Sequence, residues 1–185
     1  MKKLLSALAA CIAISGTTNA MAEDGDKTLV AYFSATGTTA GVAQKLANAT
    51  GGDLFEIVAE QPYTSEDLDW QNDQSRSAIE MNDRNTRPAI SSNVEDMAQY
   101  KIVFIGFPIW WGREPSIIDT FVESYDFADK TIIPFATSGS SEIGDSGANI
   151  QSLAPNAHVL SGQRFSSDIS EEDLKNWADT EMANQ

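Results

Sequence analysis

The chain of 185 residues contains one cysteine, Cys11, and one histidine, His158. A single cysteine excludes an intrachain disulfide and a metal site built from several thiolates. A single histidine excludes a cluster of imidazole ligands and argues against Ser-His-Asp chemistry. His158 also lies in a strand-like run, Ala157-His-Val-Leu160, so we interpret it as a structural residue. We therefore predict neither a catalytic side chain nor a metal site.

Basic residues are also scarce. There are 12 lysines and arginines against 27 aspartates and glutamates, which gives a formal net charge of −15. Such a surface repels nucleic acid and anionic membranes and suits a basic protein partner, although many proteins are acidic for solubility alone. We expect no nucleic-acid partner.

The apolar run near the N-terminus, Leu4–Ile14, is too short to span a bilayer. It follows Met1-Lys-Lys and precedes small residues at Ala20-Met-Ala22, the pattern of a cleaved export signal. The protein is therefore expected in the periplasm or outside the cell. A lipid anchor at Cys11 is the alternative, since Leu8-Ala-Ala-Cys11 resembles a lipoprotein box. The predicted organisation is a signal peptide over 1–22, a linker over 23–27 and one domain over 28–185.

Strand-like and helix-like segments alternate through that domain, and two of the strands are apolar throughout, as in a parallel sheet covered on both faces. This pattern predicts a doubly wound α/β domain. The predicted strands are Thr28–Phe33, Leu54–Val58, Ile102–Gly106, Thr131–Phe135 and Ala157–Leu160. The predicted helices are Thr39–Ala49, Pro115–Tyr125, Asp145–Leu153 and Glu171–Glu181.

The polar segment 61–99 interrupts this alternation. We predict a helix from Ser65 to about Met81 and a second helix over Val94–Tyr100, together covering the edge of the sheet. Trp70 is interpreted as a packing residue of this segment.

The first predicted strand ends in a turn rich in hydroxyl side chains and is followed at once by a helix. Backbone N–H groups at a helix start, together with the helix dipole, favour an anion. Ser34, Thr36, Thr38 and Thr39 would add neutral donors, which fits a phosphate group. The alternative is that these residues merely cap the helix. The spacing matches neither a Walker loop nor a Rossmann glycine pattern.

Two further loops follow the third and fourth predicted strands, and the carboxyl ends of parallel strands share one edge of the sheet. Loop 107–115 contains Trp110 and Trp111, whose rings offer flat surfaces, and loop 136–144 is rich in small polar residues. Together, the three loops indicate a phosphorylated planar heterocycle as ligand.

These three loops resemble those of the flavodoxin family. Ser34-Ala-Thr-Gly-Thr-Thr39 looks like the phosphate loop, and Pro108-Ile-Trp-Trp-Gly112 and Thr137–Gly144 look like the two isoalloxazine loops. The resemblance extends from Lys27 to the C-terminus. It implies three layers, a five-stranded parallel sheet of order 2-1-3-4-5, and FMN as cofactor.

The resemblance also implies roles for individual residues. Those expected at the phosphate are Ser34, Thr36, Gly37, Thr38 and Thr39. Either Trp110 or Trp111 would lie against the isoalloxazine ring, in a loop shaped by Pro108, Ile109 and Gly112. Those expected at the other ring edge are Thr137, Ser138, Gly139, Ser140 and Gly144.

The resulting hypothesis is an FMN-binding electron carrier outside the cytoplasm. Its partner would be a redox protein with a basic docking face or a small electron donor or acceptor. One alternative is an NAD(P)H-dependent FMN or quinone oxidoreductase. Another is a flavodoxin-like binding module without flavin.

Overall fold

The structure is a computed structural model that describes residues 27–184. The predicted signal peptide, the alternative anchor at Cys11 and residues 23–26 of the predicted linker lie outside the described residues. Within 27–184, no helix combines the length and the hydropathy that a membrane crossing requires.

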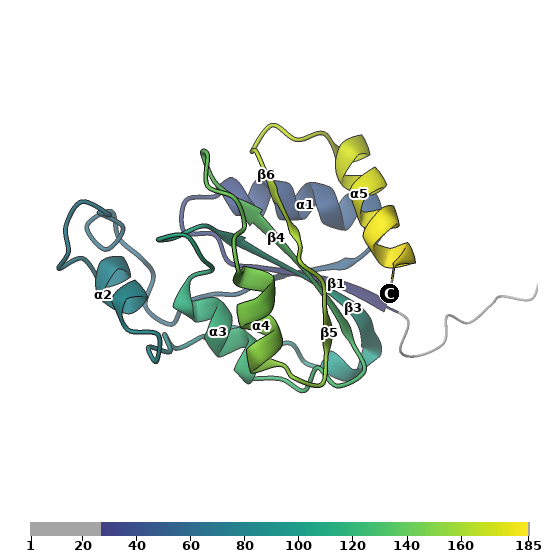
Figure 1. Cartoon of the computed structure of the whole chain (residues 1–185), viewed down its shortest axis with the longest axis horizontal. Helices are drawn as coiled ribbons and strands as arrows, with labels where there is room; N and C mark the ends of the chain where they lie inside the picture. The colour runs from purple at the N-terminus through teal and green to yellow at the C-terminus, as the bar shows by residue number, and fades with distance from the viewer. Residues whose placement is uncertain (1–26, 185) are drawn as a thin grey trace, which may run out of the picture.

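A parallel sheet forms the middle layer, with five strands hydrogen-bonded in the order β2-β1-β3-β4-β5 (Figure 1). A sixth short strand, β6, pairs with β4 beyond the end of β5. The predicted strand order is therefore confirmed. The strands are β1 Lys27–Tyr32, β2 Asp53–Glu56, β3 Tyr100–Pro108, β4 Thr131–Thr137, β5 His158–Val159 and β6 Gln163–Phe165.

Helices cover both faces of the sheet, which confirms the predicted three-layer doubly wound fold (Figure 1). On one face, α1 Thr38–Thr50 packs beside α5 Glu171–Ala183. On the other face, α3 Ser116–Glu123 packs beside α4 Ser146–Leu153.

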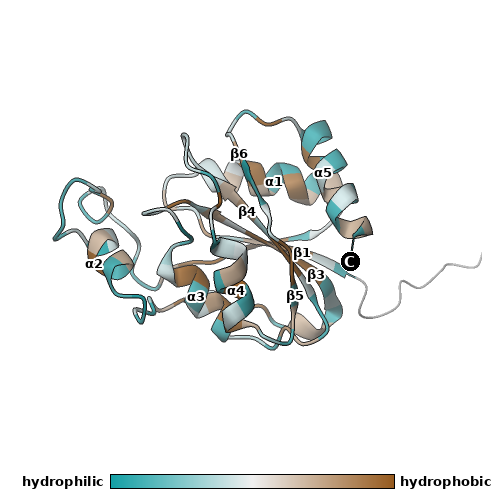
Figure 2. Ribbon diagram, viewed as in Figure 1, coloured by the Kyte–Doolittle hydropathy of each residue, from teal (hydrophilic) through white to brown (hydrophobic). Residues whose placement is uncertain are grey.

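The central strand β3 supplies both halves of the core, because successive side chains point to opposite faces. Val103 and Ile105 pack with the α3 and α4 layer, whereas Phe104 packs with the α1 and α5 layer, and all three are fully buried. Figure 2 accordingly shows the central strands as the most hydrophobic part of the ribbon.

The last edge of the sheet differs from the single predicted strand Ala157–Leu160, because β5 ends at Val159 and β6 begins at Gln163. Leu160 N donates to Ile132 O of β4 over 2.9 Å. Pro134 lies two residues further along β4 and therefore faces the same edge strand, but proline has no N–H group to donate to it. Opposite it, Gly162 has φ +75°, and an added Cβ would lie 2.3 Å from Pro134 O. The edge strand is therefore split at Pro134.

The segment 61–99 also departs from the prediction. Residues 64–75 form turns, and the helix α2 is limited to Arg76–Asn82, so the predicted helix from Ser65 is wrong in its first half. Asp and Asn side chains accept from nearby main-chain N–H groups here, as between Asp69 Oδ1 and Gln71 N (3.1 Å), and such bonds compete with a helix. The predicted helix over Val94–Tyr100 is only one 3-10 turn, η1 Met97–Gln99. Residues 61–82, here called the α2 lobe, project from the body of the molecule (Figure 1).

Candidate functional site

The turn after β1 leaves the start of α1 open. Gly37 adopts φ +88°, α1 begins at Thr38, and no side chain caps the helix. Ser34 Oγ instead accepts from Gly37 N over 3.1 Å. The exposed hydroxyls of Thr36 and Thr38 lie 3.4 Å apart at this end. Because the hydroxyl residues do not serve as caps, the first amide groups of α1 remain available to an anion.

Thr39 has a different role from its neighbours. It is buried, and its Oγ1 lies 2.8 Å from the buried Thr137 Oγ1 at the end of β4. Thr137 O also accepts from Ile109 N over 3.1 Å. Thr137 therefore joins all three predicted loops, and the Thr39 hydroxyl holds them together while its main-chain N–H stays at the helix end.

The tryptophan loop is a tight turn closed by two hydrogen bonds, from Trp110 N to Arg113 O (2.9 Å) and from Arg113 N to Trp110 O (3.1 Å). Its two central residues have positive φ, 47° at Trp111 and 81° at Gly112, as in a type I′ turn. That conformation is strained for tryptophan.

The turn gives its two tryptophans different surroundings. Trp110 packs edge-on against Phe33 and Tyr63, with ring centroids 5.6 and 5.3 Å away. Trp111 is 48% exposed and is the ring that remains free to stack on a ligand.

The third loop lies against the tryptophan loop, since a Cβ added at Gly144 would be 3.0 Å from Gly112 O. Ser138 Oγ donates to Ser141 O, which closes the loop on itself. Gly139 and Ser140 are exposed, and neither has positive φ, so serine at position 140 is not strained.

A cavity of about 400 Å³ opens beside these loops. Six predicted site residues line it, whereas none of the predicted residues of loop 137–144 does. Leu68, Trp70 and Ser77 of the α2 lobe also line it and were missed. The interpretation of Trp70 as a packing residue is wrong, because it is 71% exposed. The lining residues are Ala35, Thr36, Thr39, Leu68, Trp70, Ser77, Pro108, Ile109, Trp110 and Trp111.

Tyr63 joins the α2 lobe to Trp110, one of the residues that line this cavity. Its hydroxyl donates to Glu80 over 2.6 Å, and Arg76 holds the same carboxylate over 2.7 Å. Burial and the bond to Glu80 raise the pKa of Tyr63 well above its ordinary value, so the phenol stays protonated. Because the Tyr63 ring packs on Phe33 and Trp110, the lobe and the loops form one wall.

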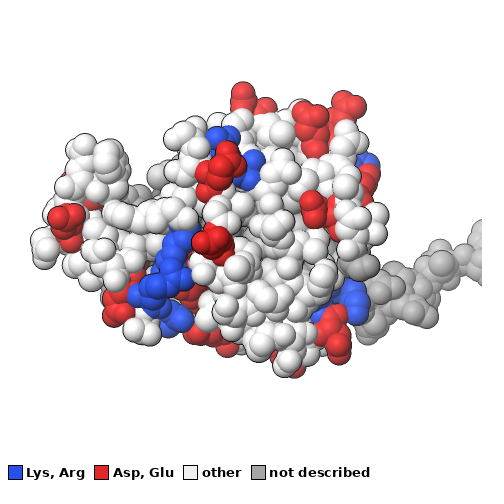
Figure 3. All heavy atoms as spheres, viewed as in Figure 1, with Lys and Arg blue, Asp and Glu red and all other residues white. Residues whose placement is uncertain are grey.

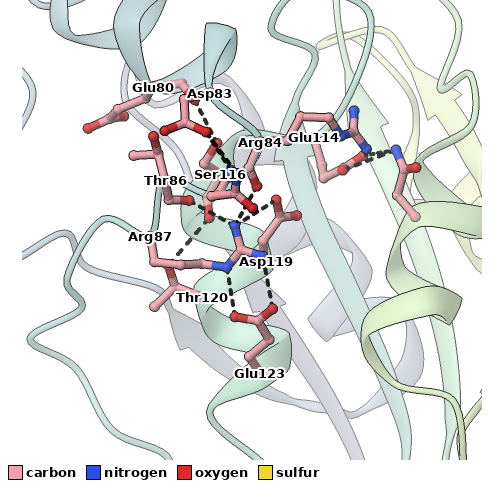
Figure 4. A network of polar contacts seen from close by, with 12 residues as sticks. Glu80, Asp83, Arg84, Thr86, Arg87, Glu114, Ser116, Asp119, Thr120 and Glu123 are labelled. Carbon is pink, nitrogen blue, oxygen red and sulfur yellow. Dashed lines mark hydrogen bonds and ion pairs between the residues drawn. The ribbon is translucent and has the colours of Figure 1, made fainter.

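A buried polar network joins the end of the tryptophan turn to α3 and α2, and Figure 4 shows its members Glu80, Glu114, Ser116 and Asp119. Arg113, the last residue of the turn, donates to Glu114 (2.9 Å), Asp119 (3.1 Å) and Ser116 (3.1 Å). Ser116 Oγ in turn donates to the main-chain oxygen of Glu80 in α2 over 3.1 Å. Burial, and secondly Glu114, raise the pKa of Asp119. The network ties the turn to α3 and to the α2 lobe, and nothing in the sequence pattern indicated it.

The parallel sheet, the open start of α1 and the three joined loops define a flavodoxin-like α/β protein. The chain belongs to the flavodoxin family, whose model matches residues 27–181. The resemblance seen in the loops is thereby confirmed, and with it FMN as the expected cofactor.

Solved structures agree with this assignment. A candidate flavoprotein from Bacteroides eggerthii DSM 20697 is 50% identical, with a TM-score of 0.79, over 83% of this chain and 96% of that one. A second, from Bacteroides uniformis ATCC 8492, is 48% identical, with a TM-score of 0.80, over 84% and 99%. A flavoprotein from Lactobacillus acidophilus NCFM, solved in complex with FMN, shares the fold at 21% identity and a TM-score of 0.61, over 83% and 99%. A comparison with curated proteins finds no match.

Proposed function

We propose that this protein binds FMN and acts as an electron carrier outside the cytoplasm. The observation that carries the proposal is the uncapped start of α1, with the exposed hydroxyls of Thr36 and Thr38, beside an apolar cavity that displays Trp111. A volume of about 400 Å³ is within the usual range for cofactor pockets. The FMN complex of the Lactobacillus acidophilus protein supports the choice of ligand.

Each part of the site has a distinct task in this proposal. The α1 amides, with Thr36 and Thr38, would hold the phosphate through neutral donors, and Trp111 would lie along the isoalloxazine ring. Bound FMN would supply the electron- and hydride-transfer chemistry, while the protein supplies binding, orientation and exclusion of water. No general acid, base or nucleophile is assigned.

The acidic surface is the basis for proposing a basic redox partner. On the face shown in Figure 3, acidic side chains are spread over the surface and do not gather into one patch. The proposed attraction is therefore a property of the overall charge of −15, without a docking face assigned to it.

A second candidate function is an NAD(P)H-dependent oxidoreductase, in which a second substrate must reach the ring. The exposed side chains of Trp70 and Trp111 at the cavity favour it, because they leave that side open to solvent. Stopped-flow mixing of the FMN-loaded protein with NADPH distinguishes an electron carrier from such an oxidoreductase. A carrier leaves the flavin absorbance unchanged on the second timescale, whereas an oxidoreductase bleaches it.

We expect the purified protein, mixed with excess FMN and desalted, to retain about one flavin per chain, seen in its visible spectrum. A colourless protein fraction would contradict FMN binding and favour a binding module without flavin. Inorganic phosphate added in large excess should weaken retention, because it competes for the start of α1.

Replacing Trp111 by asparagine should stabilise the apoprotein and weaken flavin binding. Asn-Gly suits both positive φ values of a type I′ turn, so relief of strain should add about 1 kcal/mol to the unfolding free energy. Loss of the indole should lower the affinity for FMN and for riboflavin about tenfold, the equivalent of 1.4 kcal/mol. Urea unfolding and fluorescence titration measure the two effects.

The matched control for that turn is Trp111→Phe, which keeps an aromatic face and keeps the strain. It should retain most of the flavin affinity and gain no stability. Equal behaviour of the two variants would refute the assigned role of Trp111.

A further inference from the structure

Ser77 in the α2 lobe has an unusual position for a polar side chain. It lines the cavity, only 1% of the residue is exposed, and its Oγ has no hydrogen-bond partner among the described residues. Its main-chain N–H donates to Asp67 O over 3.0 Å, so the hydroxyl is the donor of Ser77 that has no partner. A buried hydroxyl without a partner is costly. Three other buried polar atoms of the described residues also lack a partner, but Ser77 is the one of these four residues that lines the cavity.

The residues beside Ser77 on the same wall are apolar and incompletely covered. Trp70 is 71% exposed at the cavity, and Leu68 is only half-buried. Apolar side chains that remain partly exposed and gather at one cavity, here Leu68, Trp70 and Trp111, are typical of a ligand-binding groove. The wall therefore combines apolar area with one unsatisfied polar atom, which suits a flat ligand that has polar groups at its edge.

The wall is held in place before any ligand arrives. Tyr63 and Arg76 both bind the Glu80 carboxylate, and Ser116 Oγ donates to the main chain of Glu80. Ser75 Oγ accepts from Ala78 N at the start of α2, over 3.3 Å. The position of Ser77 is thus determined by its neighbours and does not depend on its own hydroxyl.

We propose that the α2 lobe forms a wall of the flavin pocket, with Ser77 Oγ hydrogen-bonded to the polar edge of the isoalloxazine ring and Trp70 and Leu68 covering the ring. This inference rests on the proposed FMN binding. The ring is assigned to this wall because the phosphate donors lie on α1, whereas the lobe side of the cavity is apolar. A hydroxyl can donate or accept, so it can pair with either a carbonyl or an N–H group of the ring.

The test compares FMN with riboflavin, which has the same ring but no phosphate. Ser77→Ala should lower the affinity for both about fivefold to tenfold, as expected for one lost hydrogen bond. The melting temperature of the apoprotein should stay the same or rise, because an unsatisfied hydroxyl is removed. Ser65→Ala, at an exposed position of the same lobe, is the control and should change neither quantity.

Trp70→Ala provides an independent variant, since its exposed side chain contributes little to the fold. This variant should also lower the affinity for FMN and the affinity for riboflavin, and both by the same factor. Flavin fluorescence titrations give the affinities, and thermal unfolding without ligand gives the stability.

The outcomes separate this inference from the proposed function. If the wild-type protein binds neither flavin, the proposed function fails. If it binds FMN while Ser77→Ala and Trp70→Ala keep full affinity, only the lobe assignment is overturned. The lobe assignment is equally overturned if Ser77→Ala lowers the affinity for FMN but not for riboflavin. It is also overturned if this variant lowers the melting temperature of the apoprotein.

Discussion

Replacing Thr38 by glutamate is expected to lower the affinity for FMN by about two to three orders of magnitude while riboflavin binding persists. The new carboxylate would stand at the start of α1, where the phosphate is proposed to bind. Two like charges about 4 Å apart near a protein surface repel by roughly 4 kcal/mol, which sets the upper end of this range. The helix itself should tolerate the change, because acidic residues are favourable in a first turn.

Thr38→Gln is the matched control, since it has nearly the same shape without the charge. We expect it to lose less than tenfold in FMN affinity, the equivalent of one hydrogen bond. Titration at low and high salt should show that the glutamate effect shrinks as ions screen it. A parallel loss of riboflavin binding in Thr38→Glu would place the phosphate elsewhere.

Replacing Arg113 by methionine is expected to lower the unfolding free energy by about 3–5 kcal/mol, as when one partner of a buried ion pair is removed. Arg113 bridges Glu114 and Asp119, and all three residues are buried. Without the guanidinium, two carboxylates would remain close together in a poorly solvated site. Urea unfolding at pH 7 measures the loss.

The same variant should recover part of its stability in acid. The folded-state pKa of Asp119 is raised by burial and by Glu114, so the folded protein binds this proton more tightly than the unfolded chain does. Stability therefore rises as the pH falls through the raised pKa toward the ordinary value of 3.8. Loss of Arg113 raises this pKa further, although Arg87 remains 3.7 Å from Asp119. The difference in unfolding free energy between Arg113→Met and the wild type should consequently become smaller from pH 7 to pH 5.

Lys175→Met serves as the control for a lost cation. Lys175 and Asp179 form a surface pair with side chains about half exposed, so its removal should cost less than about 0.5 kcal/mol and show little dependence on pH. An Arg113→Met protein no less stable than Lys175→Met would show that the buried network contributes nothing to folding.

The central architecture could be predicted from the sequence because the relevant signals are local. Apolar runs define β1, β3 and β4, and the hydroxyl turn and the tryptophan loop follow two of these strands directly. Parallel pairing then places those loops at one edge of the sheet. The split at Pro134 could not be foreseen, because it depends on which residue of the neighbouring strand faces the proline.

The rest of the site depends on contacts between segments far apart in the chain. Ser77 and Trp70 lie in a polar segment without periodicity, and only the folded lobe brings them to the cavity. Trp70 did carry a signal, since a large aromatic residue in a polar segment is unusual. The role of Thr39 as a link to Thr137 required the structure, because the sequence grouped it with the phosphate donors.

The outer strands of the sheet have a consequence for behaviour at high concentration. β2 has four residues, and the opposite edge is divided between a two-residue and a three-residue strand. Long, regular borders of a sheet invite pairing with other chains, and short or interrupted ones discourage it. These short edges, together with mutual repulsion between acidic molecules, should protect the apoprotein from aggregation.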